Sequence, residues 1–285
     1  TNIVANMLFG AISGSAVASA TSIGSVMKPL QDEQGYAPEF STAVNAVSAP
    51  TGLLIPPSNT LILYSLVSGG TSIATLFVAG YIPGILWGLS CMIVAYVFAK
   101  KNNYPVSERV SFKQGLKITL QALPALSLII IVVGGIIFGF FTPTEGSAVA
   151  VLYAFLLMLC YRTFSLKNLP AMLFETAKTT GTVMLLIGAS SMMIHIMTIA
   201  NIPNAIANAL LSVSSNPNVI MMLLIIFLLF VGTFMDIAPA VLIFTPIFLP
   251  ICKGFGMNVI HFGIFITYAM CIGGITPPVG NILFA

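Results

Sequence analysis

Apolar residues follow one another in long continuous runs along most of the chain, and short groups of Gly, Pro, Ser and Asn interrupt some of these runs. Uninterrupted runs cover residues 73–99, 118–141, 143–160 and 180–200, close to the ~20 residues that a helix needs to cross a bilayer. A transmembrane β-barrel would instead show alternating segments of about ten residues. Because backbone polar groups in lipid must be paired within each segment, these runs predict membrane-spanning helices.

Two further apolar segments are broken near their centres. Residues 1–29 break at Ser13-Gly14-Ser15, and neither arm reaches the length of a span. Residues 218–250 break near Asp236, an isolated carboxylate in an apolar run. We predict one re-entrant hairpin from each segment, with its tip at the break.

Two more segments are interrupted by consecutive prolines. Residues 40–68 contain Pro56-Pro57, and residues 260–285 contain Pro277-Pro278. Proline removes a backbone donor and cannot continue a helix without disturbing it. Each segment therefore predicts one discontinuous helix with a break inside the membrane.

The connecting segments are more polar. Residues 30–39 (LQDEQGYAPE) predict a charged loop, residues 162–178 a basic cytoplasmic segment, and residues 201–217 an uncharged connection on the outer side. Thr142 and Glu145 have the spacing of a helix N-terminal capping box.

Composition restricts the class of protein. The chain has 285 residues, of which 58% are hydrophobic and 6% charged, whereas soluble domains carry about 25% charged residues. The net charge of +3 is spread over loops, which gives no surface for nucleic acid. We expect an all-α polytopic membrane protein.

The basic residues set the orientation. Residues 100–117 hold five Lys or Arg against one acid, so they are expected in the cytoplasm. Counting spans from there predicts that the hairpin of residues 1–29 opens toward the cytoplasm and that the hairpin of residues 218–250 opens toward the outer side.

The two hairpin and broken-helix units repeat at one constant offset, the shift along the chain that carries Pro29 onto Pro250. This repeat offset needs no gap, and it also superimposes Gly35 on Gly256, Gly52 on Gly273, Pro56 on Pro277 and Pro57 on Pro278. It places Ser15 on Asp236. Opposite orientations make this an inverted repeat, a plan in which secondary transporters bind substrate and ions near the bilayer midplane.

The chemistry of the breaks supports that interpretation. A helix that ends inside the bilayer exposes unpaired N–H and C=O groups, which need a cavity or a ligand. Its N-terminal end attracts an anion, and its C-terminal end offers carbonyl oxygens to a hard cation such as Na⁺. Purely structural alternatives are also open. In these alternatives the small residues of the first tip would serve helix packing, each proline pair would be a simple kink, and Asp236 would cap a helix.

Five segments carry a resemblance to a known family. They read FGAISGSAVASATSIGSVMKP, LLIPPSNT, GFFTPTEGSAVAV, GTFMDIAPAVLIFTPIFLP and GGITPPVGN. Together they resemble the large membrane subunit (M, or DctM-like) of tripartite ATP-independent periplasmic (TRAP) transporters, over essentially the whole chain. The run Ser58-Asn59-Thr60 looks closer to members that handle sialic acid than to C4-dicarboxylate members.

The resemblance implies a fold like that of the ion-transporter superfamily, working as an elevator. It also implies Na⁺-coupled import of a small organic acid of the sialic acid or C4-dicarboxylate class across the bacterial inner membrane, in which the chain would be a multi-pass protein. A small membrane subunit (Q) and a periplasmic substrate-binding protein (P) are the expected partners. The implied Na⁺ ligands are Ser13, Gly14, Ser15, Thr51, Gly52, Gly232, Thr233, Asp236, Gly273, Gly274 and Thr276. The implied substrate contacts are Ser15, Pro56, Pro57, Ser58, Asn59, Thr60, Pro277 and Pro278.

We expect three regions in what is a fragment of a longer chain. Residues 1–68 and 218–285 form the transport repeats, and residues 69–217 are mainly scaffold spans and basic loops. The hairpins and broken helices would move against spans 73–99, 118–160 and 180–200. A membrane-embedded hydrolase using Ser13 or Ser15 with His195 is an alternative, although no GxSxG turn is present. A channel is a third.

Overall fold

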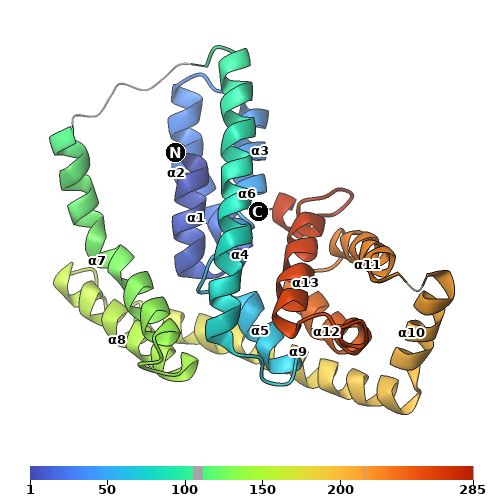
Figure 1. Cartoon of the computed structure of the whole chain (residues 1–285). Coiled ribbons are helices and arrows are strands. Elements are labelled where there is room, and N and C mark those ends of the chain that lie inside the picture. The colour runs from blue at the N-terminus through green and yellow to red at the C-terminus, as the bar shows by residue number, and fades with distance from the viewer. Residues whose placement is uncertain (105–111, 215, 285) are drawn as a thin grey trace. The chain divides into compact units, whose positions relative to one another are not determined.

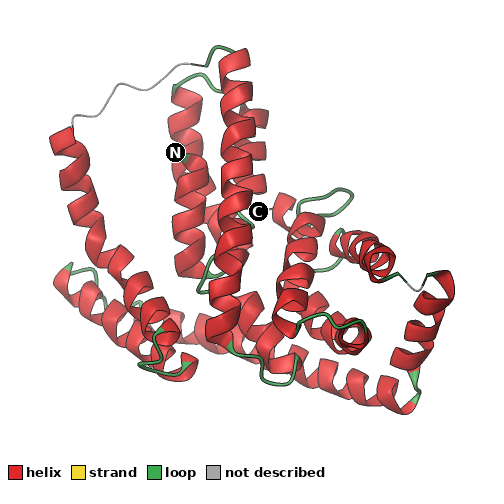
Figure 2. Ribbon diagram, in the orientation of Figure 1, coloured by secondary structure: helices red, strands yellow, loops and turns green. Residues whose placement is uncertain are grey.

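The computed structural model describes residues 1–104, 112–214 and 216–284 of the chain. Every regular element in these ranges is a helix, as Figure 2 shows, and the described residues contain no strand. The prediction of an all-α protein is confirmed. Part of the basic loop of residues 100–117, including Arg109, lies outside the described residues.

The chain divides into two compact units, Thr1–Tyr104 with Leu186–Ala285, and Pro105–Leu185. The first unit contains both predicted hairpins and both predicted broken helices. The division of residues 1–68, 69–217 and 218–285 into transport and scaffold regions stays a prediction.

The second unit is built around two helices. These are α7 (Phe112–Ile137) and α8 (Pro143–Cys160), followed by the start of α9 (Leu169–Ile199). At the start of α8 the Thr142 side chain accepts from the Glu145 N–H, and the Glu145 carboxylate accepts from the Thr142 N–H. The predicted capping box is therefore confirmed. Tyr153 and Ser127 pair their hydroxyls at 2.6 Å and join α7 to α8.

Five helices in the described residues are long and apolar enough to cross a membrane. They are α6 (Ile73–Lys101), Lys113–Ile137 of α7, α8, α9 and α12 (Ile237–Gly254). The first four correspond to the uninterrupted runs of the sequence. The fifth is the second arm of a predicted hairpin, and its length alone would allow it to cross. The protein is thus an all-α, multi-pass membrane protein.

Both hairpins appear as helix pairs. The first consists of α1 (Asn2–Ser13) and α2 (Ala16–Glu33), and the second of α11 (Pro217–Gly232) and α12. The repeat offset carries the first residue of α2 onto the first residue of α12, and the last residue of α2 onto the last of α12. Helix α2 continues through Pro29 as α12 continues through Pro250. Both end near a glycine with positive φ, Gly35 or Gly256.

Both broken helices are also present. The first comprises α3 (Pro38–Ser48), the single turn α4 (Thr51–Leu54) and α5 (Asn59–Val67). The second comprises α13 (Val259–Gly274) and the 3₁₀ turn η1 (Asn281–Phe284). The first residues of α3 and α13 are also related by the repeat offset. The peptide bonds Pro56-Pro57 and Pro277-Pro278, both cis, lie between the parts.

The last helical part of each repeat packs against the hairpin of the other repeat. Helix α5 of the first broken helix packs against α12, the second arm of the other hairpin. Turn η1 of the second broken helix packs in the same way against α2. Figure 1 shows the N-terminal helices (blue), α6 and the C-terminal helices (red) of this unit. These reciprocal contacts join the two repeats into one packed body.

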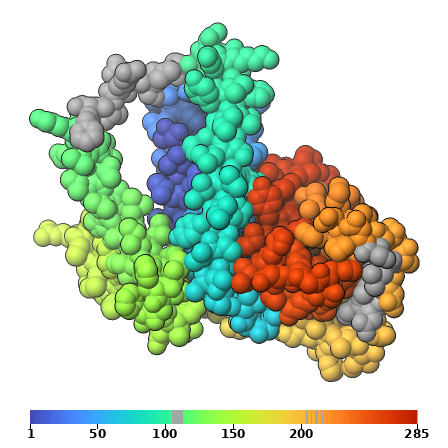
Figure 3. All heavy atoms as spheres, in the orientation of Figure 1, coloured from blue at the N-terminus to red at the C-terminus, as the bar shows by residue number. Residues whose placement is uncertain are grey.

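Helix α6 lies against the broken helices through a stripe of small residues. A methyl group at Gly80 would overlap the carbonyl of Leu54, one at Gly84 would lie 2.6 Å from the Ile55 side chain, and one at Gly88 would overlap the side chain of Met7. Contacts between α6 and α13 complete this face, and the space-filling view in Figure 3 shows the two helices touching. Helix α6 is therefore packed tightly into the unit that holds the hairpins.

Three predicted loops are partly helical. The expected loop of residues 30–39 is wrong for residues 30–33 and 38–39. Helix α2 passes Pro29 and runs to Glu33, just before the left-handed Gly35, and α3 begins at Pro38. Residues 169–178 belong to α9, where good helix formers outweigh the charges. Residues 202–213 form α10 (Ile202–Val213).

Candidate functional site

The first hairpin tip lies directly at the first break. A methyl group at Gly14 would lie 3.1 Å from the Pro57 carbonyl oxygen and 3.3 Å from the Asn59 backbone nitrogen. Gly14 has φ 62, and it accepts this close approach because it has no side chain. The tip therefore contacts the residues that follow the Pro-Pro bond, the predicted substrate segment.

The second tip makes the corresponding contact through hydrogen bonds. The Gly280 N–H donates to the Thr233 carbonyl at 2.9 Å. The Asn281 amide donates to Asp236 Oδ1 at 2.8 Å. Under the repeat offset, Gly280 and Asn281 stand where Asn59 and Thr60 stand in the first repeat. Each tip thus contacts its own helix break at related positions.

Glycine pairs allow the backbones to touch beside each tip. A methyl group at Gly10 would overlap the Cα of Gly52. In the second repeat a methyl group at Gly273 would lie 2.6 Å from the Cα of Gly232. Gly52 and Gly232, predicted as ion ligands, therefore lie at contacts between hairpin and broken helix. Gly274 is buried beside Ile237 and Ile282.

The tips carry helix caps at equivalent positions, with different charge and different N–H donors. Ser15 caps α2 by accepting a hydrogen bond from the Ala18 N–H, and Ser13 donates to the Ser15 carbonyl. Asp236 caps α12 by accepting from the Ile237 N–H at 2.8 Å. The cap alternative for Asp236 is correct as geometry. Both its hydrogen bonds use Oδ1, and no described residue donates to Oδ2.

Three predicted hydroxyl ligands donate to nearby carbonyls. Thr51 donates to Ser48, Thr233 to Phe230 and Thr276 to Ile272. A hydroxyl that donates its proton keeps oxygen lone pairs for another partner. These threonines remain suitable ligands for a hard cation. Thr51 is fully buried and Thr276 is half-buried.

The predicted substrate contacts differ in exposure. Pro56, Ser58 and Thr60 are buried, whereas Asn59, Pro277 and Pro278 are exposed. The Ser58 hydroxyl donates to the Leu53 carbonyl and accepts from the Leu61 N–H, so it bridges the break and caps α5. Asn59 is therefore the first-repeat side chain of this segment that is free to meet a ligand.

The residue types restrict which ion this site can bind. Among the described residues, no three or more His, Cys, Asp or Glu side chains are grouped so that they could hold a metal ion. The available ligands are hydroxyls, carbonyls and the Asp236 carboxylate, which suit hard cations and not soft metals. His195 is exposed on α9, and no described hydrogen bond joins it to Ser13, Ser15 or Ser190.

Sequence analysis missed a buried polar cluster behind the first tip. The Asn6 amide donates to Asn45 at 2.9 Å and to the Ser48 hydroxyl at 2.8 Å, while its oxygen accepts from Ser19. Asn6 is fully buried. It ties both arms of the hairpin to α3. The signal was available, because Asn2 and Asn6 lie one turn apart in an apolar run.

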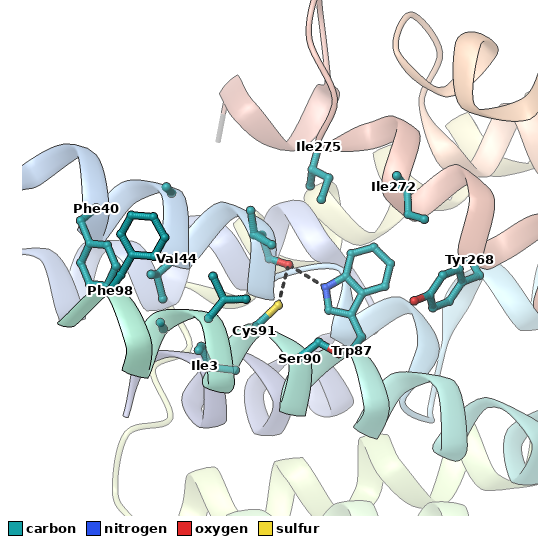
Figure 4. A pocket seen from close by; sticks show the side chains of 14 residues that line it. Ile3, Phe40, Val44, Trp87, Ser90, Cys91, Phe98, Tyr268, Ile272 and Ile275 are labelled. Carbon is teal, nitrogen blue, oxygen red and sulfur yellow. Dashed lines mark hydrogen bonds between the residues drawn. The ribbon is translucent and has the colours of Figure 1, made fainter. Parts of the chain in front are cut away.

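An apolar groove of about 510 Å³ runs along α1, α3, α6 and α13. Figure 4 shows Trp87 and Cys91 on one wall, both donating to the Val47 carbonyl, with Tyr268 beside the indole. The Trp87 N–H bond measures 2.9 Å, and the rings of Trp87 and Tyr268 meet edge to face at 5.0 Å. These contacts fix the end of α3 just before the first break.

Comparisons with known proteins show which proteins this chain is similar to. An uncharacterized protein of Salmonella typhimurium, YgiK, is 54% identical over 283 residues, which are 99% of this chain and 65% of that protein. The C4-dicarboxylate TRAP transporter large permease protein DctM of Pseudomonas aeruginosa is 38% identical, over 99% of this chain and 66% of its own length. The sialic acid TRAP transporter large permease protein SiaM of Vibrio cholerae is 36% identical over the same shares.

The chain thus spans about two thirds of the length of these relatives. Its whole length, residues 1–285, matches the family described as the DctM component of tripartite ATP-independent periplasmic transporters. This family consists of transport proteins, which argues against the hydrolase alternative. Family membership and the apolar helices of this chain together indicate a multi-pass protein of the inner membrane. The chain belongs to the DctM family of TRAP transporter large membrane subunits.

Proposed function

We propose that the protein imports a small organic acid by coupling its movement to Na⁺, with the two tip and break sites as the binding region. The observation that carries the proposal is the repeated contact of each hairpin tip with its own helix break, at Gly14 with Asn59 and at Thr233 with Gly280. Helix ends that meet in this way present paired sets of backbone donors and acceptors, which an ion and an anion together would satisfy.

The first tip suits the anion. The N-terminal ends of α2 and α5 converge where Gly14 meets Asn59, and both are capped by neutral serines, Ser15 and Ser58. Two helix N-termini add partial positive charge, which favours a carboxylate. The exposed Asn59 amide adds a donor for it.

The second tip suits the cation. Asp236 brings a full negative charge to the start of α12, and its Oδ2 has no hydrogen bond in the described residues. The hydroxyls of Thr233 and Thr276 lie on the tip and on the break. We propose Na⁺ binding at both breaks, with Asp236 as its only charged ligand.

We further propose that α6 travels with the hairpins and is not part of the scaffold. Gly80, Gly84 and Gly88 bring its backbone into contact with the break residues and α1. Packed interiors do not slide continuously past one another, because close packing leaves discrete arrangements. The moving body of the proposed elevator would then include α6, which revises the boundary expected from the sequence.

The partners follow from the family description, which is tripartite. We propose that a small membrane subunit and a periplasmic binding protein act with this chain. Two of the three relatives named above carry a substrate in their names, C4-dicarboxylate for one and sialic acid for the other. The Ser58-Asn59-Thr60 segment is the feature of this chain that we propose to favour sialic acid.

The test is uptake in proteoliposomes that contain the complete protein and both partners, under imposed Na⁺ gradients, with sialic acid and a C4-dicarboxylate compared. We expect saturable uptake that requires inward Na⁺. Asp236→Asn keeps a side-chain oxygen for the cap but removes the charge, so it should fold normally and lose Na⁺-driven uptake by roughly tenfold or more. Asp236→Ala should lose the cap as well.

Glu175→Gln is the matched control, because Glu175 is an exposed acid whose ion-pair partner is Lys178 at 4.0 Å. It should leave uptake unchanged. Normal Na⁺-dependent uptake by Asp236→Asn would refute the role of the carboxylate. Uptake that does not saturate and needs no binding protein would favour the channel alternative instead.

A further inference from the structure

Four polar side chains behind the first tip form one hydrogen-bonded group, which we call the Asn6 network. The Asn6 amide nitrogen donates to Asn45 Oδ1 at 2.9 Å and to Ser48 Oγ at 2.8 Å. Asn6 Oδ1 accepts from the Ser19 hydroxyl at 2.8 Å. Asn6, Ser19 and Ser48 are fully buried, and Asn45 is half-buried. The network therefore joins α1, α2 and α3 through uncharged groups.

The second repeat shows that the fold does not require polar side chains here. Gly232 makes the backbone contact beside the second tip that Gly10 makes beside the first. Leu228 lies one turn before Gly232, so it takes the place of Asn6. The repeat offset gives the other counterparts, which are Ala240 for Ser19, Ile266 for Asn45 and Ala269 for Ser48. All four counterparts are apolar and at most 3% exposed, so an apolar core supports the same hairpin.

The Asn6 network reaches both sides of the proposed first ion site. Ser19 lies one turn after Ser15, the helix cap at the tip. Ser48 is the last residue of α3, and its carbonyl accepts from the Thr51 hydroxyl at 2.7 Å. Thr51 is the break residue proposed above as an ion ligand. Asn6 thus links the arm that follows the tip to the end of the helix that precedes the break.

The two tips differ in charge, which makes the position of the oxygens matter more in the first repeat. The second tip has Asp236 to attract a cation, whereas the first has the neutral Ser15. A site of hydroxyl and carbonyl oxygens has no full charge to offer, so its affinity depends on how firmly the surrounding residues hold those oxygens. Removing groups that hold metal ligands in place typically weakens metal binding by about 10–100-fold.

We propose that Asn6 is a positioning residue for the first ion site, acting through Ser48 and Thr51 without touching the ion. The network fixes the end of α3 against the hairpin, so that the neutral oxygens of the break are already in place for Na⁺. This order replaces the carboxylate that the second repeat uses. The inference rests on the proposed Na⁺ coupling and adds a residue that lies outside the tip and the break.

The test is equilibrium binding of radioactive Na⁺ to the purified complete protein carrying Asp236→Asn, so that the first site is measured alone. Ser48→Ala removes an acceptor of Asn6, and the buried Ala269 shows that alanine fits the equivalent position. We expect the Na⁺ dissociation constant to rise roughly tenfold. Ser48→Thr keeps the hydroxyl and should bind Na⁺ like its parent. A purely structural role would lower the melting temperature or the number of sites and leave the dissociation constant unchanged.

Ser41→Ala is the matched control, since Ser41 is a buried serine of the same helix whose hydroxyl has no partner among the described residues. It should leave the dissociation constant unchanged. Ser19→Ala, whose counterpart is the buried Ala240, should act like Ser48→Ala and replaces it if that variant fails to fold.

The outcomes separate this inference from the proposed function. Na⁺ affinity that neither Ser48→Ala nor Ser19→Ala changes would overturn the positioning role and leave the proposed function intact. Na⁺ binding by the wild type but not by Asp236→Asn would show that the first repeat has no ion site of its own, which also overturns the inference. A wild type that binds no Na⁺ would overturn the proposed function and this inference together.

Discussion

The two repeats have the same helices but fill the space behind their hairpins differently. Behind the second hairpin, α5 covers α12 and α13, and the Tyr64 ring lies against Gly263 and donates its hydroxyl to the Val259 carbonyl at 2.5 Å. Behind the first hairpin, η1 contacts α2, and the polar residues Lys28, Gln31 and Ser41 stand where the second repeat has Leu249, Cys252 and Phe262. The two repeats share the backbone plan of the hairpin and differ in the polarity of the residues behind it.

The hairpin tips differ in the same way. Ser15 and Asp236 occupy equivalent positions and both cap the helix that follows, although Ser15 accepts from the Ala18 N–H and Asp236 from the Ile237 N–H. One is neutral and the other is an acid. Equivalent positions in the two repeats therefore carry different charge.

The largest effect is expected where backbones touch. Gly52→Ala would push a methyl group into the Cα of Gly10, and Gly273→Ala would place one 2.6 Å from the Cα of Gly232. Backbone cannot move aside as a side chain can, so we expect each variant to lose ~1–3 kcal/mol of stability. Thermal unfolding of the purified protein in detergent measures the loss.

Gly254→Ala is the control for this pair, because a methyl group there meets nothing within 4 Å. It should unfold like the wild type. If Gly273→Ala were tolerated while Gly52→Ala was not, the two contacts between hairpin and broken helix would not be equivalent.

A smaller effect is expected from the hydroxyl that seals the second repeat. Tyr64→Phe removes the donor to Val259 while the ring stays in place. The buried carbonyl is left without that partner, which should cost ~1 kcal/mol. The same thermal unfolding assay applies, with Tyr161→Phe as a control because Tyr161 is an exposed ring. An unchanged melting temperature for Tyr64→Phe would show that this link does not stabilise the seal.

The smallest effect is expected at two buried hydroxyls, one in each repeat. Thr245 is fully buried on α12, and its hydroxyl has no hydrogen-bond partner among the described residues. Thr245→Val should therefore stabilise the protein, by up to ~1 kcal/mol. The Ser41 hydroxyl is also buried without a partner among the described residues, so Ser41→Ala should stabilise the protein by a similar amount. Thermal unfolding measures both changes, and a lower melting temperature for either variant would show that its hydroxyl has a partner.

Much of the fold could be predicted because Gly and Pro act locally. The tip at Ser13-Gly14-Ser15, the breaks at the two Pro-Pro pairs and the cap at Asp236 all appear where the sequence placed them. In each case the residue type itself excludes a continuous helix or supplies the cap. The constant repeat offset then predicted matching helix limits in the two repeats.

The remaining features depend on contacts between segments distant in sequence. Helix α2 passes Pro29 and ends at Glu33, because the left-handed Gly35 that follows ends the helix and the proline only weakens it. The partner of the first tip is Asn59, and Gly52 instead meets Gly10. Neither pairing has a local signal. The Na⁺ and substrate roles of these residues stay predictions.

Equilibrium binding of radioactive Na⁺ to the purified complete protein tests the ion sites most directly. The wild type should bind Na⁺ saturably, and Asp236→Asn should lose the site at the second tip while the site at the first tip remains. Glu175→Gln should bind like the wild type. Unchanged Na⁺ binding by Asp236→Asn, or no Na⁺ binding by the wild type, would contradict the proposal that the hairpin tips and helix breaks form the ion sites.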